Sequence, residues 1–199
     1  MKKILKKYLV HFSLSAWLVG LSIPMIYFHA WHSAALPEVQ LKQDFLKTQI
    51  SEDSWEMVHF VDQSCLCSNF VANHLVARAS DKSLNEMVYM LGDSEEVFNA
   101  LKDKGYKVQK IHGEFLVEKF GITGVPAFAI FSPGKKLKYF GGYNERSINK
   151  FSKIKDLEIL KLVRQGKDVS KLPQFGCANS KALQAKLDPL RLKYEEGVK

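Results

Sequence analysis

The chain has 199 residues, of which 46% are hydrophobic, 25% charged and 12% aromatic. This composition leaves room for one globular domain and an appendage, and it excludes a disordered chain, a collagen-like repeat and a disulfide-dense miniprotein. The formal net charge is +8, but neither zinc-knuckle spacing nor a basic stripe with interleaved aromatic residues accompanies it. We therefore expect a solvated basic surface and no nucleic-acid partner.

The first residues predict a membrane signal. Four lysines lie within the first seven positions, and residues 8–31 follow without Asp, Glu, Lys or Arg. That length suffices for a transmembrane helix, and the lysines should stay cytoplasmic. We predict a signal anchor over residues 1–31, which makes the chain a single-pass protein of the bacterial inner membrane with its domain in the periplasm. The small residues 33–35 leave a cleaved signal peptide, and a secreted or periplasmic product, as the alternative.

Residues 32–52 are predicted as a linker with a short helix, and residues 53–199 as one domain. Hydrophobic periodicity and turn residues indicate that strands and helices alternate in its first half. The predicted elements are a strand at 55–61, a helix from Ser68, a strand at 86–91, a helix that ends at Gly105, a strand at 106–111 and a short helix at 114–120.

The second half is predicted to close the domain with a hairpin of two strands, 127–131 and 137–140. An insertion at about 144–176 should carry one helix, and a last helix should run from Asn179 or Ser180 to Leu192. Strands that alternate with helices before a hairpin indicate an α/β fold around one mixed sheet.

Two motifs carry a resemblance to a known family. Cys65 and Cys67 stand where the first strand ends and a helix begins, and Val125-Pro126 lies in the segment 120–128 before the hairpin. Together they resemble the thioredoxin-like superfamily, and in particular bacterial membrane-anchored thioredoxin-like thiol–disulfide oxidoreductases with a Cys-x-Cys motif. The resemblance covers about residues 55–143. It implies a thioredoxin-like fold, with a mixed central sheet flanked by helices, and a cis Val125–Pro126 bond against the cysteines.

The resemblance also implies catalytic roles. Cys65 is expected to be the exposed nucleophile, acidified at a helix N-terminus, and Cys67 is expected to resolve the mixed disulfide. Most redox-active relatives have two residues between their cysteines, whereas only Leu66 separates these two. The smaller ring should be more strained and more reducible, which favours an oxidising or isomerase-like pair. No cofactor and no resident metal are expected.

Two further residues are candidates for the site. His59 stands six residues before Cys65, where thioredoxins typically have a buried acid, so it is either a proton-transfer group or a core histidine. Cys177 precedes the last predicted helix, near the side of the fold where Pro126 is expected. It is either a third redox thiol, a metal ligand or an isolated thiol.

These features predict a thiol–disulfide oxidoreductase or isomerase that acts on exported proteins. Its partners would be protein thiols and disulfides outside the cytoplasm, a membrane or soluble redox partner, and the membrane through the N-terminal helix. One alternative is a membrane-anchored copper(I) chaperone, because soft thiolates suit Cu(I). Its ligands would be the close cysteines with Cys177 or with a histidine (His59, His74 or His112). The other alternative is a non-catalytic thioredoxin-like binding module.

Overall fold

The computed structural model describes residues 2–189 and Tyr194. The chain divides into two compact units, Met1–Ala34 and Ala35–Lys199. The boundary places residues 35–52, the predicted linker, with the larger unit. Leu41, Leu46 and Ile50 of this segment are buried in one of its cores.

The smaller unit is one helix, α1 (Lys2–Ser33), which contains Pro24. Among residues 2–189, no helix is long and apolar enough to cross a membrane. The predicted transmembrane helix is therefore corrected. Polar residues such as His11, Ser13 and Ser15 dilute the uncharged stretch, and lysines occupy the first turns of the helix.

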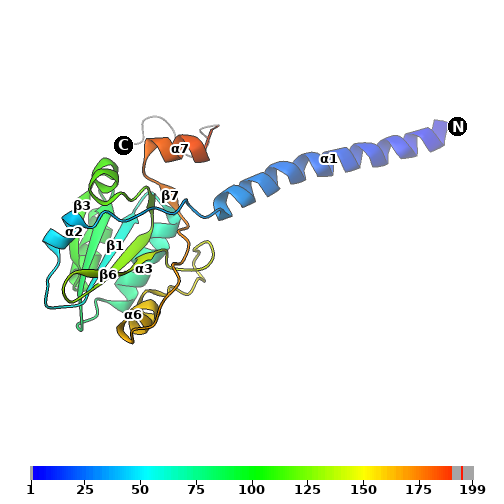
Figure 1. The fold of residues 1–199 in the computed structure, drawn as a ribbon. Coiled ribbons are helices and arrows are strands. Elements are labelled where there is room, and N and C mark those ends of the chain that lie inside the picture. The colour runs from blue at the N-terminus through cyan, green and yellow to red at the C-terminus, as the bar shows by residue number, and fades with distance from the viewer. Residues whose placement is uncertain (1, 190–193, 195–199) are drawn as a thin grey trace. The chain divides into compact units, whose positions relative to one another are not determined.

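The larger unit is a mixed α/β structure built on a five-stranded sheet (Figure 1). Its strands are β1 (Glu56–Asp62), β2 (Asn85–Leu91), β3 (Lys107–Ile111), β5 (Ala127–Ser132) and β6 (Lys136–Gly141), in the order β3-β2-β1-β5-β6. The strands β1, β2 and β3 are parallel, whereas β5 is antiparallel to both β1 and β6. A second ladder joins two short antiparallel strands, β4 (Gly124–Val125) and β7 (Cys177–Ala178).

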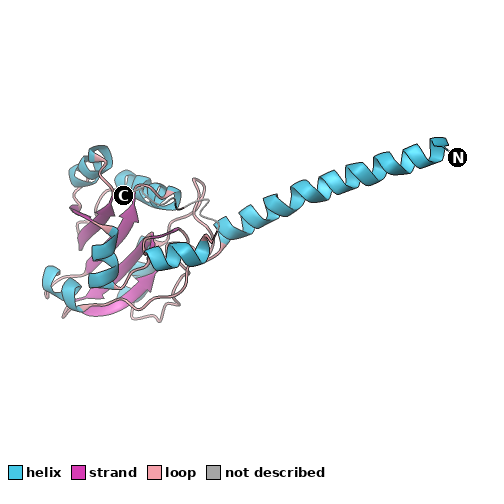
Figure 2. Cartoon of the chain, turned by 90° about the horizontal axis from the view of Figure 1, so that it is seen from above, coloured by secondary structure: helices cyan, strands magenta, loops and turns pink. Residues whose placement is uncertain are grey.

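Helices cover both faces of the five-stranded sheet, as Figure 2 shows. The helices of this unit are α2 (Asp44–Gln49), α3 (Leu66–Arg78), α4 (Glu95–Asp103), α5 (Gly113–Phe115), the π-helix η1 (Leu116–Phe120), α6 (Asp156–Arg164) and α7 (Lys181–Leu187), of which α7 follows the short strand β7. The helices α3, α4 and α6 pack in one core with Met57 and Val61, and α2 and η1 pack in a second core with Val58 and Phe60. The side chains of β1 alternate between the two faces, and its apolar residues are buried on both, Met57 and Val61 on one and Val58 and Phe60 on the other.

This architecture fits a thioredoxin-like fold. The predicted α/β class, mixed sheet and hairpin are confirmed. The segment 144–176 carries one helix, α6. The last helix is capped by Ser180, whose hydroxyl accepts a hydrogen bond from the amide of Leu183 at 3.2 Å. The predicted continuation through Leu190 and Leu192 lies outside the described residues.

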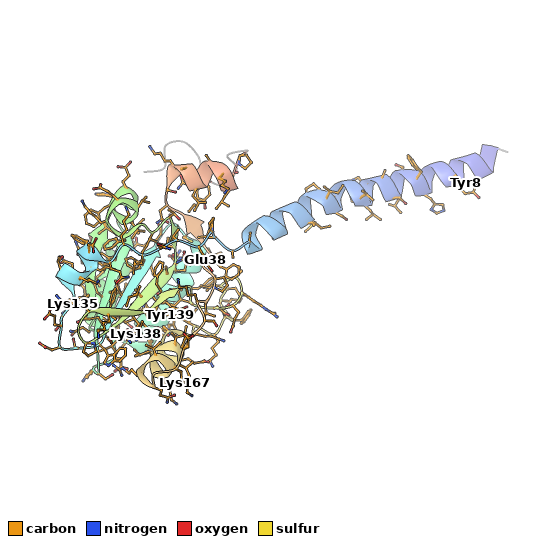
Figure 3. All side chains as sticks on the ribbon, viewed as in Figure 1. Tyr8, Glu38, Lys135, Lys138, Tyr139 and Lys167 are labelled. Carbon is orange, nitrogen blue, oxygen red and sulfur yellow. The ribbon has the colours of Figure 1, made fainter. Side chains whose placement is uncertain are left out.

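The long segment after β6 is fixed to the hairpin by Tyr139. On β6, Lys138 is exposed and Tyr139 is buried; both are labelled in Figure 3. The Tyr139 hydroxyl donates to the carbonyl of Gly142 at 2.9 Å and accepts from the amide of Leu172 at 3.2 Å. Gly142 allows the chain to approach closely, because a Cβ there would lie 2.0 Å from the carbonyl oxygen of Pro173. These contacts direct residues 172–176 back toward the cysteines.

Candidate functional site

The two neighbouring cysteines lie where the central strand passes into a helix. After β1, a turn forms in which the amide of Cys65 donates to the carbonyl of Asp62 at 3.0 Å. The Asp62 carboxylate accepts from the amide and hydroxyl of Ser64. Burial raises the pKa of Asp62, and these hydrogen bonds oppose that rise. Cys65 is the N-cap of α3, so Cys67 lies in the first turn of that helix.

The segment before the hairpin lies against Cys65. The Cys65 Sγ is 3.8 Å from the carbonyl oxygen of Val125. The peptide bond between Val125 and Pro126 is cis, as expected. Val125 and Pro126 thus belong to the same site as the cysteines, although they stand about sixty positions later in the chain.

Cys177 reaches the same site through the β4–β7 ladder. In this ladder Val125 is the register partner of Cys177. The preceding Gly176 packs so tightly on Val125 and Pro126 that a Cβ would lie 1.9 Å from the Val125 carbonyl oxygen. The side chain of Cys177 hydrogen bonds to Cys65. Of the three interpretations that the sequence allows for Cys177, an isolated thiol does not fit this position.

The pKa of the Cys65 thiol is strongly lowered. The hydrogen bond with Cys177 is the largest influence and lowers the pKa of Cys65, which reaches about 3 from its ordinary value of 9.0. The hydrogen bond with Cys67 and the amide of Ser68 act in the same direction, whereas burial opposes them. A thiolate is the reactive species in disulfide exchange, so the lowered pKa favours Cys65 as a reactive group of this site.

The exposure of the three cysteines differs from the expectation. Cys65 is fully buried, with 0% exposure, so the predicted exposed nucleophile is corrected. Cys67 and Cys177 are both half-buried. Cys65 is buried because it packs beneath the Val125 carbonyl and beside Cys177. The resemblance implies the first of these neighbours and leaves the second open. Leu66, between the two cysteines, exposes 67% of its surface.

The insertion also contributes to the site, which sequence reasoning missed. The Cys67 Sγ lies 3.6 Å from the carbonyl oxygen of Ile148, in the loop between β6 and α6. Phe151 of the same loop is 85% exposed. In the sequence, Phe151 stands among lysines and marks no contact with Cys67.

His59 belongs to a buried polar network behind the site. Its Nδ1 lies 2.8 Å from the Tyr143 hydroxyl, and its Nε2 lies 3.2 Å from Glu86 Oε1. The Tyr143 hydroxyl also donates to the carbonyl of Ala127 at 3.3 Å. Among the described residues, the hydrogen bonds of the His59 side chain thus go to Tyr143 and Glu86 and not to a cysteine. This favours the core interpretation of His59 over proton transfer.

The network continues through Arg78 at the end of α3. Its guanidinium binds Glu86 and also donates from Nε to Asp156 Oδ2 at 2.9 Å. Asp156 in turn lies 3.2 Å from His74 Nε2. Burial raises the pKa of Glu86, but the hydrogen bonds from His59 and Arg78 prevail and lower it to about 2. Burial likewise opposes the ionisation of Asp156, whose pKa His74 and Arg78 nevertheless lower to about 2.

The network joins the cysteine helix, the sheet and the insertion through charges shielded from water. In the sequence, two members of this network stand out: Glu86 lies within an apolar strand, and Asp156 lies at the start of a helix in the segment 144–176. Asp156 stands 78 positions after its partner Arg78, so the sequence gives no sign of their contact.

The described residues hold no cluster of three or more His, Cys, Asp or Glu side chains arranged to bind a metal ion. Two of the histidines considered for copper, His59 and His74, instead bind Glu86 and Asp156. The third, His112, precedes α5 as its N-cap residue.

A family model described as "Domain of unknown function (DUF6436)" matches residues 35–150. The chain belongs to this family. The matched region contains the five-stranded sheet, both neighbouring cysteines and Pro126, but it ends before α6 and Cys177. No curated protein sequence matches the chain.

Solved structures of the same fold exist. A hypothetical protein of Sinorhizobium meliloti 1021 is 14% identical with a TM-score of 0.51, over 73% of this chain and 95% of its own. An uncharacterized conserved protein of Geobacillus kaustophilus is 17% identical with a TM-score of 0.52, over 74% of this chain and 90% of its own. The N-terminal domain of PilB from Neisseria gonorrhoeae matches with 13% identity and a TM-score of 0.39, over 67% and 90% of the two chains. The first two likenesses show the fold and say nothing of activity.

Proposed function

We propose that the chain is a thiol–disulfide oxidoreductase whose redox pair is Cys65 and Cys67. The observation that carries the proposal is the position of Cys65, which is the N-cap of α3 beside the Val125 carbonyl, with Cys67 in the first turn of that helix. Burial in apolar surroundings raises the pKa of an inert thiol, whereas the neighbours of Cys65 lower its pKa despite its burial.

The reaction is a two-electron exchange. In the oxidising direction, a substrate thiolate attacks the Cys65–Cys67 disulfide, and one chain cysteine leaves as a thiolate. A second substrate thiolate then attacks the mixed disulfide, so the substrate gains a disulfide and the pair becomes a dithiol. The hydrogen bonds to Cys65 stabilise the ionised form that leaves, which makes the reduced pair more stable and the disulfide more oxidising.

The substrate is proposed to be a protein. Leu66 exposes its side chain directly between the two cysteines, and Phe151 is exposed on the loop that contacts Cys67. Apolar side chains beside a reactive sulfur favour contact with the apolar residues of an incompletely folded polypeptide.

We further propose that these proteins are exported ones. The support is the basic start of the chain followed by uncharged residues 8–31, a pattern typical of export signals. Fractionation of cells that make the full chain tests this part separately: recovery of the domain with periplasmic proteins supports it, and recovery in the cytoplasm contradicts it.

The activity is tested by the recovery of scrambled ribonuclease in a glutathione buffer. The full chain should accelerate recovery, and Cys65→Ala should abolish the acceleration while thermal unfolding shows that the variant is folded. Full activity of a folded Cys65→Ala chain would reject the proposal.

A further inference from the structure

Cys65 has two cysteine neighbours, which reach it from different parts of the fold. Cys67 comes from the first turn of α3, and Cys177 comes from β7, more than one hundred positions later. Both side chains hydrogen bond to Cys65. The arrangement is therefore built around one sulfur that is common to two possible pairs.

The position of Cys177 is fixed by the backbone around it. Cys177 is paired in register with Val125, whose carbonyl oxygen lies 3.8 Å from the Cys65 Sγ. On one side of Cys177, Gly176 packs on Val125 and Pro126 at a distance that admits no side chain. On the other side, the amide of Asn179 donates to the carbonyl of Thr123 at 2.8 Å.

We propose that Cys65 is shared by two alternative disulfides, Cys65–Cys67 and Cys65–Cys177, which interconvert within the chain. This inference rests on the proposed function, because it names how the same site passes its disulfide on. The interconversion gives Cys177, which the family match does not include, a role in the reaction.

The interconversion needs no external oxidant. The Cys177 thiolate attacks Cys65 Sγ, the Cys65–Cys67 bond breaks, and Cys67 leaves as a thiolate that takes up the proton released by Cys177. One disulfide and one thiol are present before and after the step, so no electrons enter or leave the chain.

The three sulfurs differ in burial, so the two disulfides leave different thiols accessible. Cys65 is fully buried, and Cys67 and Cys177 are half-buried. With Cys65 bonded to Cys67, the half-buried thiol is Cys177; with Cys65 bonded to Cys177, it is Cys67 beside Leu66 and the Ile148 carbonyl. The exchange thus moves the reactive thiol between two places while the buried sulfur stays in both bonds. The second disulfide also ties β7 covalently to α3.

Three full-chain variants that each retain two cysteines test the proposal. After equilibration in glutathione buffers and alkylation, mass spectrometry counts the remaining thiols. Cys177→Ala should oxidise to Cys65–Cys67, Cys67→Ala should oxidise to Cys65–Cys177, and Cys65→Ala should form no internal disulfide at the same potentials. Retention of both thiols in Cys67→Ala while Cys177→Ala oxidises would overturn the inference and leave the proposed function standing. Retention of both thiols in both variants would overturn the two together.

The unaltered chain provides a measurement that no folding defect affects. Trypsin releases Cys65 and Cys67 in the peptide 48–78 and Cys177 in the peptide 172–181, because Lys and Arg flank both. The oxidised chain should yield the peptide 48–78 with an internal disulfide and also joined to 172–181. Absence of the joined peptides after oxidation would contradict the proposal.

Gly176→Ala tests whether the joined peptides depend on the close approach of β7 to Val125. Its Cβ would collide with the Val125 carbonyl at 1.9 Å, so β7 must move and the yield of the joined peptides should fall. Gly113→Ala is the matched control, because its Cβ meets its nearest neighbour, the Asn179 carbonyl oxygen, at 3.4 Å. Equal yields from the two variants would contradict the proposed geometry.

Discussion

The replacement of Cys177 by Ala should raise the pKa of Cys65. The Cys177 side chain is the largest influence that lowers this pKa to about 3, and alanine cannot hydrogen bond to the thiolate. A hydrogen bond to a charged group contributes about 1.5–3 kcal/mol. One pKa unit corresponds to about 1.4 kcal/mol, so the pKa of Cys65 should rise by about one to two pH units.

Ultraviolet absorbance of the thiolate, followed against pH, measures this change. Cys65→Ala supplies the blank, because it lacks the ionised sulfur. Cys177→Ser is the matched control, since its hydroxyl can still donate to Cys65 and should retain most of the depression. Cys67→Ala should raise the pKa less than Cys177→Ala does, because the Cys67 hydrogen bond is the smaller influence.

The reasoning would be refuted if Cys177→Ala titrated like the unaltered chain. It would also be refuted if Cys177→Ser and Cys177→Ala raised the pKa equally, because the effect would then not come from a hydrogen bond.

Other parts of the site give four more predictions. His59→Ala should lower the free energy of unfolding, because it leaves buried Glu86 with fewer hydrogen-bond partners. The pH dependence of disulfide exchange should not change. A shifted pH profile would instead support His59 as a proton-transfer group. Arg78→Ala should lower the free energy of unfolding by about 3–5 kcal/mol in urea, because it removes one partner of a buried ion pair. The pKa values of Glu86 and Asp156 are lowered to about 2 from ordinary values of 4.5 and 3.8. The two carboxylates therefore stabilise the fold at a pH above those ordinary values, and this contribution is lost as the pH falls toward 2. A free energy of unfolding that stays constant over this pH range would contradict the prediction. Leu66→Ser should slow the exchange with protein substrates but leave the exchange with glutathione unchanged, and equal slowing of both would argue against a substrate contact.

The sequence predicts the local parts of this structure well. The strands and helices of the sheet follow from hydrophobic period and turn residues, and Ser180 caps its helix because the cap depends on residues three positions apart. Cys65 and Cys67 could be placed at a strand–helix junction for the same reason.

Contacts across the chain could not be predicted in the same way. The burial of Cys65 depends on Val125 and Cys177, and the contact of Cys67 depends on Ile148 in an irregular loop. No periodic pattern reports such pairings. For Cys177, the sequence left three interpretations open until the β4–β7 register showed its position.

The N-terminal segment shows a different limit. The absence of charge over residues 8–31 suggested a membrane span, but absence of charge is not the same as sufficient hydropathy. No described helix meets the length and apolar character that a membrane crossing requires.

The most direct test of the central claim is the redox equilibrium of the full chain with glutathione. Alkylation and mass measurement at a series of glutathione ratios count the thiols that remain. The account predicts one reversible two-electron transition, in which the three thiols fall to one, near or above the potential range of glutathione. Three thiols that persist across every ratio would contradict it.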